Sequence, residues 1–438
     1  MNKKIIYCCF LSCCIVATKA QPLTELYSNG NKKFEGTLSD NLPHGKWIYY
    51  YKNGQKQAEG EYEKGLKIGF WTTWYENEQK ASEGYPQTGF VKTWYKDGHL
   101  ESSGYYLDYQ KDSVWNFYYS NGQLQKECRY IFDVLQGQYI EYHPNGQKMC
   151  EGFYKDGEFE GFTKWWYANG AIEMEGNMTN GLQEGEWKFY YSDSSLGSKG
   201  LFSKGLRQGE WKYFYQSGEV WKKGNFVDDK RSGIWTAWYE SGKKQREGKF
   251  ENDKEDSLWT QWYESGKKED EGWFCAGLRC KTWTGWYPNG QKKYVIDFKD
   301  DMEHGTAQYF WESGNIQKSG KYKSGLKDGK WTQYSEFGKP LEEGNYRANK
   351  RNGMWTFYND KYGRRTRQQA FTDDVPNGKW IDYYSNQQIK AKGQYKMLSK
   401  EGKWTYYTAN GTVILEVLYK NNQKIKTLKD HSRPAVKQ

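Results

Sequence analysis

"GIWTAWYESGKKQREGKF", residues 233–250, is followed 24 residues further on by "SLWTQWYESGKKEDEGWF", residues 257–274. Both stretches contain Trp-Thr-x-Trp-Tyr-Glu-Ser-Gly-Lys-Lys. A chain that repeats itself at a fixed period of this size is built from stacked structural units, so the repeat has to be traced before any motif is interpreted. The stretch also raises a functional question, because its clustered rings could form either a ligand site or a scaffold.

The repeat extends over almost the whole chain. With Trp235 as position 0, sixteen residues fill the same slot at a spacing of 24, apart from one spacing of 20 and one of 25. A degenerate first unit begins at Leu23. The residues at position 0 are Trp47, Trp71, Val91, Trp115, Tyr139, Thr163, Trp187, Trp211, Trp235, Trp259, Trp283, Ala307, Trp331, Trp355, Trp380 and Trp404.

The pattern inside one unit predicts two strands. Position +3 is aromatic in all sixteen units, and glycine recurs at −2, +7 and +13. The glycine at +7 ends any helical periodicity after one turn. Asn-Gly and Ser-Gly near +7, and Asp-Gly or Lys-Gly near +18, are typical of hairpin turns. We therefore predict strands at about −2 to +4 and +8 to +15, in an all-β antiparallel hairpin meander of roughly thirty short strands.

Side chains alternate across a strand, so both faces of the predicted sheet carry rings. We expect the glycines at −2 and +13 to be floors on which neighbouring rings lie, and like rings to stack on like rings in one elongated domain. Most of these rings are then a structural ladder rather than a ligand cage. The tryptophans of that ladder are Trp47, Trp71, Trp115, Trp187, Trp211, Trp235, Trp238, Trp259, Trp262, Trp283, Trp331, Trp355, Trp380 and Trp404.

The repeat resembles the MORN repeat, in the bacterial MORN-variant form found in YwqK-type antitoxin proteins. The resemblance is carried by stretches such as "GEYEKGLKIGFWTTWYENEQKASEG", residues 60–84, and "GKYKSGLKDGKWTQYSEFGKPLEEG", residues 320–344. It implies β-hairpin repeats that form an extended, solenoid-like curled sheet. It also implies a role in scaffolding, partner binding or membrane association, without catalysis and without a cofactor. Some of these relatives are antitoxins, which act in the cytoplasm.

The N-terminus predicts export. Residues 1–20 combine two early lysines, an apolar run and small residues before Gln21, which is the layout of a cleaved signal peptide. Lipidation of Cys13 or Cys14 is the alternative. We therefore expect a signal peptide at 1–20 with cleavage near Ala20, a repeat domain at 21–419 and a basic tail at 420–438. The protein would be periplasmic, associated with the outer membrane or secreted, and no later segment is apolar enough to span a membrane.

Charge and cysteine content narrow the functional classes. Without residues 1–20 the chain has 62 basic and 55 acidic residues, which are interspersed, so a nucleic-acid partner is not expected. Four cysteines remain: Cys128, Cys150, Cys275 and Cys280. Cys275 and Cys280 flank the predicted turn "AGLR", and in an oxidising compartment they could form a disulfide. The alternative is two free thiols.

No motif predicts catalysis or metal binding. The histidines are dispersed, and neither a nucleophile elbow nor a phosphate loop is present. Asp-Asp pairs such as Asp228–Asp229, Asp300–Asp301 and Asp373–Asp374 fall in predicted turns, which suit aspartate for backbone reasons. The histidines are His44, His99, His143, His304 and His431.

Three functions fit the sequence. The first is a non-enzymatic exported scaffold for a protein partner or an envelope surface. The second is a glycan- or choline-binding aromatic module, because choline-binding repeats also contain runs like "GKWIYYYKNGQ", residues 45–55. The third is an antitoxin or immunity protein. Position +2 varies most between fixed rings, and we expect recognition there; it holds Tyr49, Thr73, Glu141, Trp165, Ala237, Gln261, Gly285 and Asp382 among others.

Overall fold

The computed structural model describes residues 20–431, which divide into two compact units, residues 20–206 and 207–431. Each unit consists of β-strands and turns, and no helix occurs in these residues. None of the described residues therefore forms a helix that could cross a membrane. Apart from Ala20, the predicted signal peptide lies outside the described residues.

The first unit contains short strands of similar length. They are β1 (Gln21–Leu26), β2 (Lys32–Ser39), β3 (Leu42–Tyr50), β4 (Lys56–Glu63), β5 (Leu66–Trp74), β6 (Lys80–Gly84), β7 (Gly89–Trp94), β8 (Leu100–Leu107), β9 (Gln110–Tyr118), β10 (Leu124–Ile131), β11 (Val134–Tyr142), β12 (Lys148–Lys155), β13 (Glu158–Trp166), β14 (Ile172–Thr179), β15 (Leu182–Tyr190) and β16 (Leu196–Ser203).

The second unit continues the same pattern. Its strands are β17 (Leu206–Phe214), β18 (Val220–Val227), β19 (Lys230–Trp238), β20 (Lys244–Glu251), β21 (Lys254–Trp262), β22 (Lys268–Cys275), β23 (Leu278–Trp286), β24 (Lys292–Lys299), β25 (Met302–Phe310), β26 (Ile316–Lys323), β27 (Leu326–Lys327), β28 (Gly329–Tyr334), β29 (Pro340–Arg347), β30 (Lys350–Tyr358), β31 (Arg365–Thr372), β32 (Val375–Tyr383), β33 (Ile389–Lys396), β34 (Ser399–Tyr407), β35 (Val413–Lys420) and β36 (Gln423–Asp430).

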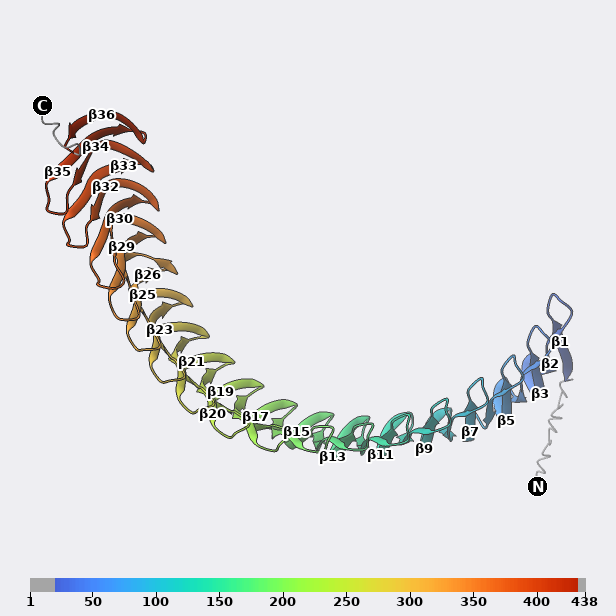
Figure 1. The fold of residues 1–438 in the computed structure, drawn as a ribbon. Helices are drawn as coiled ribbons and strands as arrows, with labels where there is room; N and C mark the ends of the chain where they lie inside the picture. The colour runs from blue at the N-terminus through green and yellow to red at the C-terminus, as the bar shows by residue number, and fades with distance from the viewer. Residues whose placement is uncertain (1–19, 432–438) are drawn as a thin grey trace, which may run out of the picture. The chain divides into compact units, whose positions relative to one another are not determined.

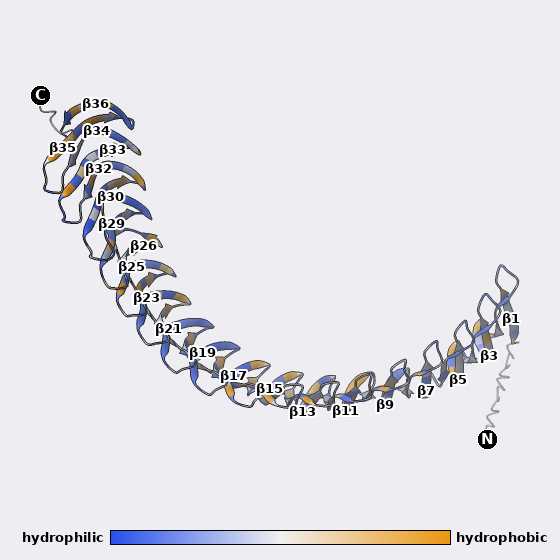
Figure 2. Ribbon diagram, in the orientation of Figure 1, coloured by the Kyte–Doolittle hydropathy of each residue, from blue (hydrophilic) through white to orange (hydrophobic). Residues whose placement is uncertain are grey.

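Within each unit, consecutive strands pair antiparallel, so successive hairpins lie side by side (Figure 1). Apolar and polar residues mix along single strands (Figure 2), as expected for a sheet without a covering layer. The predicted antiparallel hairpin meander is confirmed. The predicted solenoid-like curl is not present, because the described strands of a unit pair with their neighbours in the chain and form an open sheet.

The first strand of most repeats is longer than predicted because it contains a β-bulge. β19 runs from −5 to +3, and a register shift occurs where its residues from −2 to 0 are passed over in the pairing with β18. The glycine at −2, Gly233, has a φ of 69° in this bulge. Such a conformation suits glycine, and it lets the strand extend on both sides of the point where the sequence pattern placed its start.

The two recurrent glycines have different roles. At −2 the prediction of a floor for a ring is wrong: a Cβ on Gly353 would meet no atom within 4 Å, and its φ is 75°. At +13 the prediction is confirmed. A Cβ on Gly248 would lie 2.0 Å from Cδ2 of Trp259, and one on Gly344 would lie 2.2 Å from Cδ2 of Trp355. Where the next repeat has a tryptophan at position 0, the +13 glycine thus provides the surface on which that tryptophan lies.

The rings at position 0 do not stack like on like. Trp235 meets Phe226 of the preceding repeat and Phe250 of its own, with centroids 5.1 and 6.1 Å away and interplanar angles of 86° and 87°. Phe250 then meets Trp259 at 5.0 Å and 82°. Edge-to-face contact places positive ring edges on negative faces. The core is therefore a zigzag of tryptophan at 0 and Phe or Tyr at +15, on the face we call the tryptophan face.

Both edges of the sheet are joined between repeats. At one edge the tyrosine at +4 donates its hydroxyl to the carbonyl at +3 of the next repeat, as Tyr239 does to Trp262 at 2.8 Å. At the other edge Asp228 and Asp229 have φ values of 47° and 67°, a two-residue turn with both φ positive. The Asp pairs are therefore turn residues, as the sequence predicted.

The sheet extends to Asp430, because β36 pairs with β35. This strand lies inside residues 420–438, which the sequence assigned to a tail. The alternation in "QKIKTLKD" is lysine-rich and lacks the rings of the other repeats, so it gave no strand signal.

The two glycine roles can be separated around one tryptophan, Trp355, which is 1% exposed. Gly344→Ala should lower the free energy of unfolding by several kcal/mol, about 3 or more, because its Cβ cannot coexist with the indole. Gly353→Ala should cost about 1–2 kcal/mol, because only backbone strain opposes it. Denaturant unfolding followed by circular dichroism measures both, and equal losses for the two variants would contradict the assignment.

Candidate functional site

The predicted aromatic ladder is divided between the two faces. The described tryptophans at position 0 are buried, except Trp380, which is half-buried. Trp238 and Trp262, at +3, are half-buried on the opposite face. The ladder tryptophans therefore occupy two separate surfaces rather than one continuous stripe.

The chain's own cations cover many of these rings. The guanidinium of Arg231 lies 3.9 Å from the centroid of Phe250, and on the other face Nζ of Lys244 lies 5.7 Å from that of Trp262. Lys244 is itself held by Glu247 at 2.8 Å. Rings that already have a cation as neighbour have less free surface for a sugar or a quaternary amine. The aromatic cluster in residues 233–250 is thus mainly scaffold.

A hollow of about 370 Å³ interrupts the tryptophan face in the second unit. It lies around Ala237, at position +2. Its lining is Arg207, Tyr213, Lys222, Phe226, Asp229, Arg231, Trp235, Thr236, Ala237, Arg246, Phe250, Asp253 and Trp259. Four cations and two carboxylates line a space of the size of a small-molecule site.

The hollow exists because Ala237 is small. On the tryptophan face, positions +2 and +11 form a row across the strands, in which Ala237 pairs with Lys222 on one side and Arg246 on the other. Most other repeats fill +2 with larger residues. Where Gly285 occurs at +2, the ring of Tyr294 occupies the space, and its Cε1 lies 2.4 Å from the point that a Cβ on Gly285 would take. At Ala237 no ring does so.

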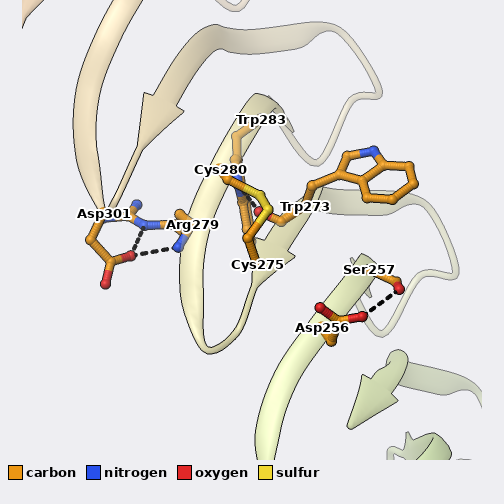
Figure 3. Close-up of a disulfide and its surroundings, with 8 residues drawn as sticks. All are labelled: Asp256, Ser257, Trp273, Cys275, Arg279, Cys280, Trp283 and Asp301. Atoms are coloured by element: carbon orange, nitrogen blue, oxygen red, sulfur yellow. Dashed lines mark hydrogen bonds and ion pairs between the residues drawn. A yellow bond between two sulfur atoms is a disulfide. The ribbon is translucent and has the colours of Figure 1, made fainter. Parts of the chain in front are cut away.

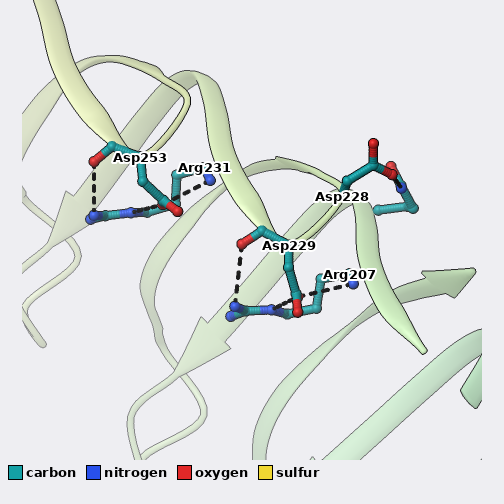
Figure 4. A network of polar contacts seen from close by, with 6 residues as sticks. Arg207, Asp228, Asp229, Arg231 and Asp253 are labelled. Carbon is teal, nitrogen blue, oxygen red and sulfur yellow. Dashed lines mark hydrogen bonds and ion pairs between the residues drawn. The ribbon is translucent and has the colours of Figure 1, made fainter. Parts of the chain in front are cut away.

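Two arginines of the hollow are held in identical settings one repeat apart (Figure 4). Arg207 donates from Nε to Oδ1 of Asp229 at 2.6 Å, and Arg231 donates from Nε to Oδ1 of Asp253 at 2.9 Å. The guanidinium of Arg207 also lies 4.0 Å from the centroid of Phe226. The hydrogen bond from Arg207 is the largest cause that lowers the pKa of Asp229. A guanidinium fixed by a ring and a carboxylate is already oriented for a ligand.

Lys222 is the cation without a carboxylate partner. No ion pair joins it to any acidic side chain in the described residues; its Nζ lies 4.6 Å from the centroid of Tyr213 and 4.1 Å from that of Trp221. Burial, and then the charges of Arg231 and Arg207, lower the pKa of Lys222. The third arginine, Arg246, donates to Glu255 at 2.7 Å. The ammonium of Lys222 therefore stands among like charges.

A second hollow, of about 480 Å³, lies in the first unit and is lined largely by rings. Its residues are Tyr49, Tyr51, Gln57, Ala58, Tyr62, Lys67, Trp71, Thr73, Trp74, Tyr75 and Ala81. The hydroxyls of Tyr49 and Tyr62 lie 3.1 Å apart, and that of Tyr51 donates to the carbonyl of Trp74 at 2.8 Å. The phenols are thus engaged within the fold.

The face opposite the tryptophans carries an exposed apolar strip in the first unit. It consists of Phe70, Tyr85, Phe90, Tyr105 and Val114, which are 50, 45, 50, 38 and 49% exposed. Phe90 pairs with Tyr105 across β7 and β8, and the rings of Phe70 and Tyr85 lie 5.4 Å apart. The strip follows positions −1 and +14 over β5 to β9. Sequence reasoning missed it, although the run of rings at these two positions was a readable signal.

Other sequence-predicted positions are engaged inside the fold. At +2, Glu141 accepts a hydrogen bond from the hydroxyl of Tyr139 at 2.8 Å, and Asp382 pairs with Arg367 at 2.9 Å. These two carboxylates thus form contacts within the sheet. Among the +2 positions singled out from the sequence, Ala237 is the one beside the hollow of about 370 Å³. Among residues 20–431 no group of three or more His, Cys, Asp or Glu side chains is placed to hold a metal ion.

The structure joins Cys275 and Cys280 by a disulfide across the turn between β22 and β23 (Figure 3). The two residues are diagonal neighbours: Cys275 pairs with Leu278, and Cys280 pairs with Trp273. Their Cα atoms are 5.9 Å apart. Cys128 and Cys150 are buried free thiols, and burial raises the pKa of both, that of Cys150 to about 12.

Comparison with known proteins supports the repeat. Nine segments match the family model described as "MORN repeat variant", and each spans one hairpin of the sheet, in agreement with the resemblance seen in the sequence. No curated protein matches the chain. The nine segments are residues 43–64, 111–131, 135–156, 207–228, 231–252, 279–300, 303–324, 327–348 and 400–421.

Two solved structures show a remote likeness. One described as TcdB2-TccC3-TEV is 9% identical, covers 93% of this chain and 23% of that chain, and has a TM-score of 0.14. Another, described as TcdB2-TccC3, is 12% identical, covers 92% of this chain and 25% of that chain, and has a TM-score of 0.15. The chain thus spans about a quarter of the length of these structures.

Thiol counting tests the cysteine assignments on the chain that begins at Gln21. In the native protein at about pH 8, Cys128 and Cys150 should react slowly with an alkylating reagent, because burial keeps them protonated. Denaturation should expose two reactive thiols, and denaturation with a reductant should expose four, as read by mass spectrometry. Four thiols without the reductant would contradict the disulfide.

Proposed function

We propose that this chain is a non-enzymatic, exported repeat scaffold that binds a protein partner through the apolar strip. The single observation that carries the proposal is the strip itself. Five successive slots at −1 and +14 hold large exposed side chains, whereas in the other repeats exposed large apolar residues in these slots, such as Phe162 and Ile234, occur singly or in pairs among charged or polar ones. Contiguous exposed apolar surface of this kind is typical of protein-interaction sites.

The strip coincides with the one shortened repeat. β6 and β7 end and begin at Gly84 and Gly89, with φ values of 137° and 145°, so the usual two-residue turn is replaced there by a wider loop. The hydroxyl of Tyr109 reaches across this repeat to the carbonyl of Lys67 at 3.1 Å. The shortened repeat makes this part of the sheet different from the other repeats. An irregularity beside exposed rings favours a surface that recognises one partner over a surface that all repeats share.

The two alternative functions would depend on features other than the apolar strip. Glycan or choline binding would use the ring-lined hollow around Tyr49 and Tyr62, but those hydroxyls and many neighbouring rings are engaged within the chain. An antitoxin of the YwqK type would bind one toxin in a fixed ratio. Both alternatives give outcomes that differ from those of a scaffold in the same capture experiment.

The experiment is affinity capture from the envelope and secreted fractions with the exported chain as bait. Mass spectrometry of the recovered bait should show Gln21 as its first residue. The double variant Phe70→Ser, Phe90→Ser should weaken capture of the main protein partner roughly tenfold or more, because it removes two apolar anchors of the strip. Circular dichroism should show an unchanged fold, since both side chains are half exposed.

The matched control is Ile234→Ser, because Ile234 occupies position −1 in the second unit and is 57% exposed. It should leave capture unchanged. Equal weakening by the control, or unchanged capture by the double variant, would overturn the proposed surface. Capture of one toxin in a fixed ratio would favour the antitoxin, and elution by polysaccharide or choline would favour the glycan module.

A further inference from the structure

The hollow around Ala237 lies in the second unit and on the tryptophan face, so the apolar strip does not account for it. We propose that it binds the oxyanion group of a small soluble ligand, of the phosphate, sulfate or carboxylate class. The inference does not depend on the proposed scaffold function. It rests on the placement of four cations around one small residue.

Two of the cations flank Ala237 on neighbouring strands. Lys222 and Arg246 are the direct cross-strand neighbours of Ala237, on β18 and β20. Neighbouring strands are about 4.8 Å apart, so the two side chains leave the sheet about 10 Å from each other with only a methyl group between them. A compact anion placed over Ala237 could contact both.

Two of the arginines are held in fixed orientations. Arg207 and Arg231 are each held by a phenylalanine ring and by a turn aspartate one repeat apart. Each guanidinium has five N–H donors and commits only some of them to its aspartate, leaving others for a ligand. Fixed guanidinium groups that line a cavity are suited to the planar recognition of oxyanions.

Lys222 is the cation of the hollow that has no ion-pair partner in the described residues. Lys222 lies close enough to Arg207 and Arg231 for their charges to act on it, and no carboxylate in the described residues pairs with it. An anion in the hollow would relieve this repulsion, which is the charge arrangement of a binding site rather than of a solvated surface. The three arginines, in contrast, each have a carboxylate partner.

The volume and the carboxylates of the hollow limit the size of the ligand that it can bind. The space of about 370 Å³ admits a small molecule. Asp229 and Asp253 line it together with the cations, and they would repel a long polyanion that passed along the row. These two carboxylates therefore favour a single compact anionic group.

Lys318 provides a matched control. It occupies the same +11 slot as Lys222 and lies 4.2 Å from the ring of Tyr309, and it has Lys327 beside it. Its cross-strand neighbours are Tyr309 and Gln333, and the adjacent space is only about 20 Å³. Lys318 thus repeats the charge of the proposed site without its cavity.

The test is isothermal titration calorimetry of the purified chain with inorganic phosphate, sulfate and malonate, against chloride at matched ionic strength. At least one oxyanion should bind saturably to one site, and binding should weaken as salt is added. The three probes distinguish which oxyanion class the site prefers. Lys222→Gln should weaken that binding about tenfold, because it removes a charge-assisted hydrogen bond.

Ala237→Phe should abolish binding without removing any charge, and the chain already accommodates Phe at this position in Phe117 and Phe357. Lys318→Gln should bind like the unmodified chain. If Ala237→Phe fails to fold by circular dichroism, the comparison of Lys222→Gln with Lys318→Gln still decides. Absence of saturable binding for every oxyanion, or equal weakening by both lysine variants, would overturn the proposal.

Discussion

The contact between a glycine at +13 and the tryptophan of the next repeat is the constraint on which the fold depends. The indole lies so close to the glycine backbone that a Cβ would fall 2.0–2.4 Å from its ring atoms at nearly every such pair. The indole Nε1 also donates to a carbonyl of the preceding strand, as Trp259 does to Lys249 at 3.1 Å. A single layer of sheet can then bury a large ring without a second layer above it.

This contact joins adjacent repeats of the chain. The edge-to-face ring contacts and the tyrosine hydrogen bonds along the edge of the sheet also connect adjacent repeats. Stability within a unit is therefore expected to accumulate from nearest-neighbour terms. Such a design tolerates local change. The shortened repeat at Val91 and the small residue at Ala237 each alter the surface in one place while the flanking repeats keep their geometry. The apolar strip lies at the shortened repeat, and the hollow lies at Ala237.

The sequence predicted the period, the two strands per repeat and the close approach at +13, because turn residues and glycines recur at fixed positions. It did not predict the bulge at −2. From the sequence, the glycine at −2 was expected to leave space for a ring. In the structure it adopts a positive φ, and Ser113, Ser257 and Lys281 adopt the same conformation at this position. Nor did it predict edge-to-face packing, since the alternation of Trp and Phe along the core depends on which strands pair.

The candidate sites were less accessible to sequence reasoning. Position +2 was identified as the varied slot, but variation alone did not show that Glu141 and Asp382 are used internally while Ala237 opens a hollow. That difference depends on the neighbour at +11, which lies on the adjacent strand. The clustering of Arg207, Lys222 and Arg231 likewise follows from register, because these residues lie on three consecutive strands.

Amide hydrogen exchange of the Trp259→Ala variant tests the central claim most directly. Loss of this indole leaves Gly248 uncovered and removes ring contacts to Phe250 and Phe274. If stability is held by neighbouring contacts, mass spectrometry should show lost protection in β20 to β22 and nearly unchanged protection in β31 to β34. Uniform loss of protection across residues 207–431, or no loss near the substitution, would contradict the account.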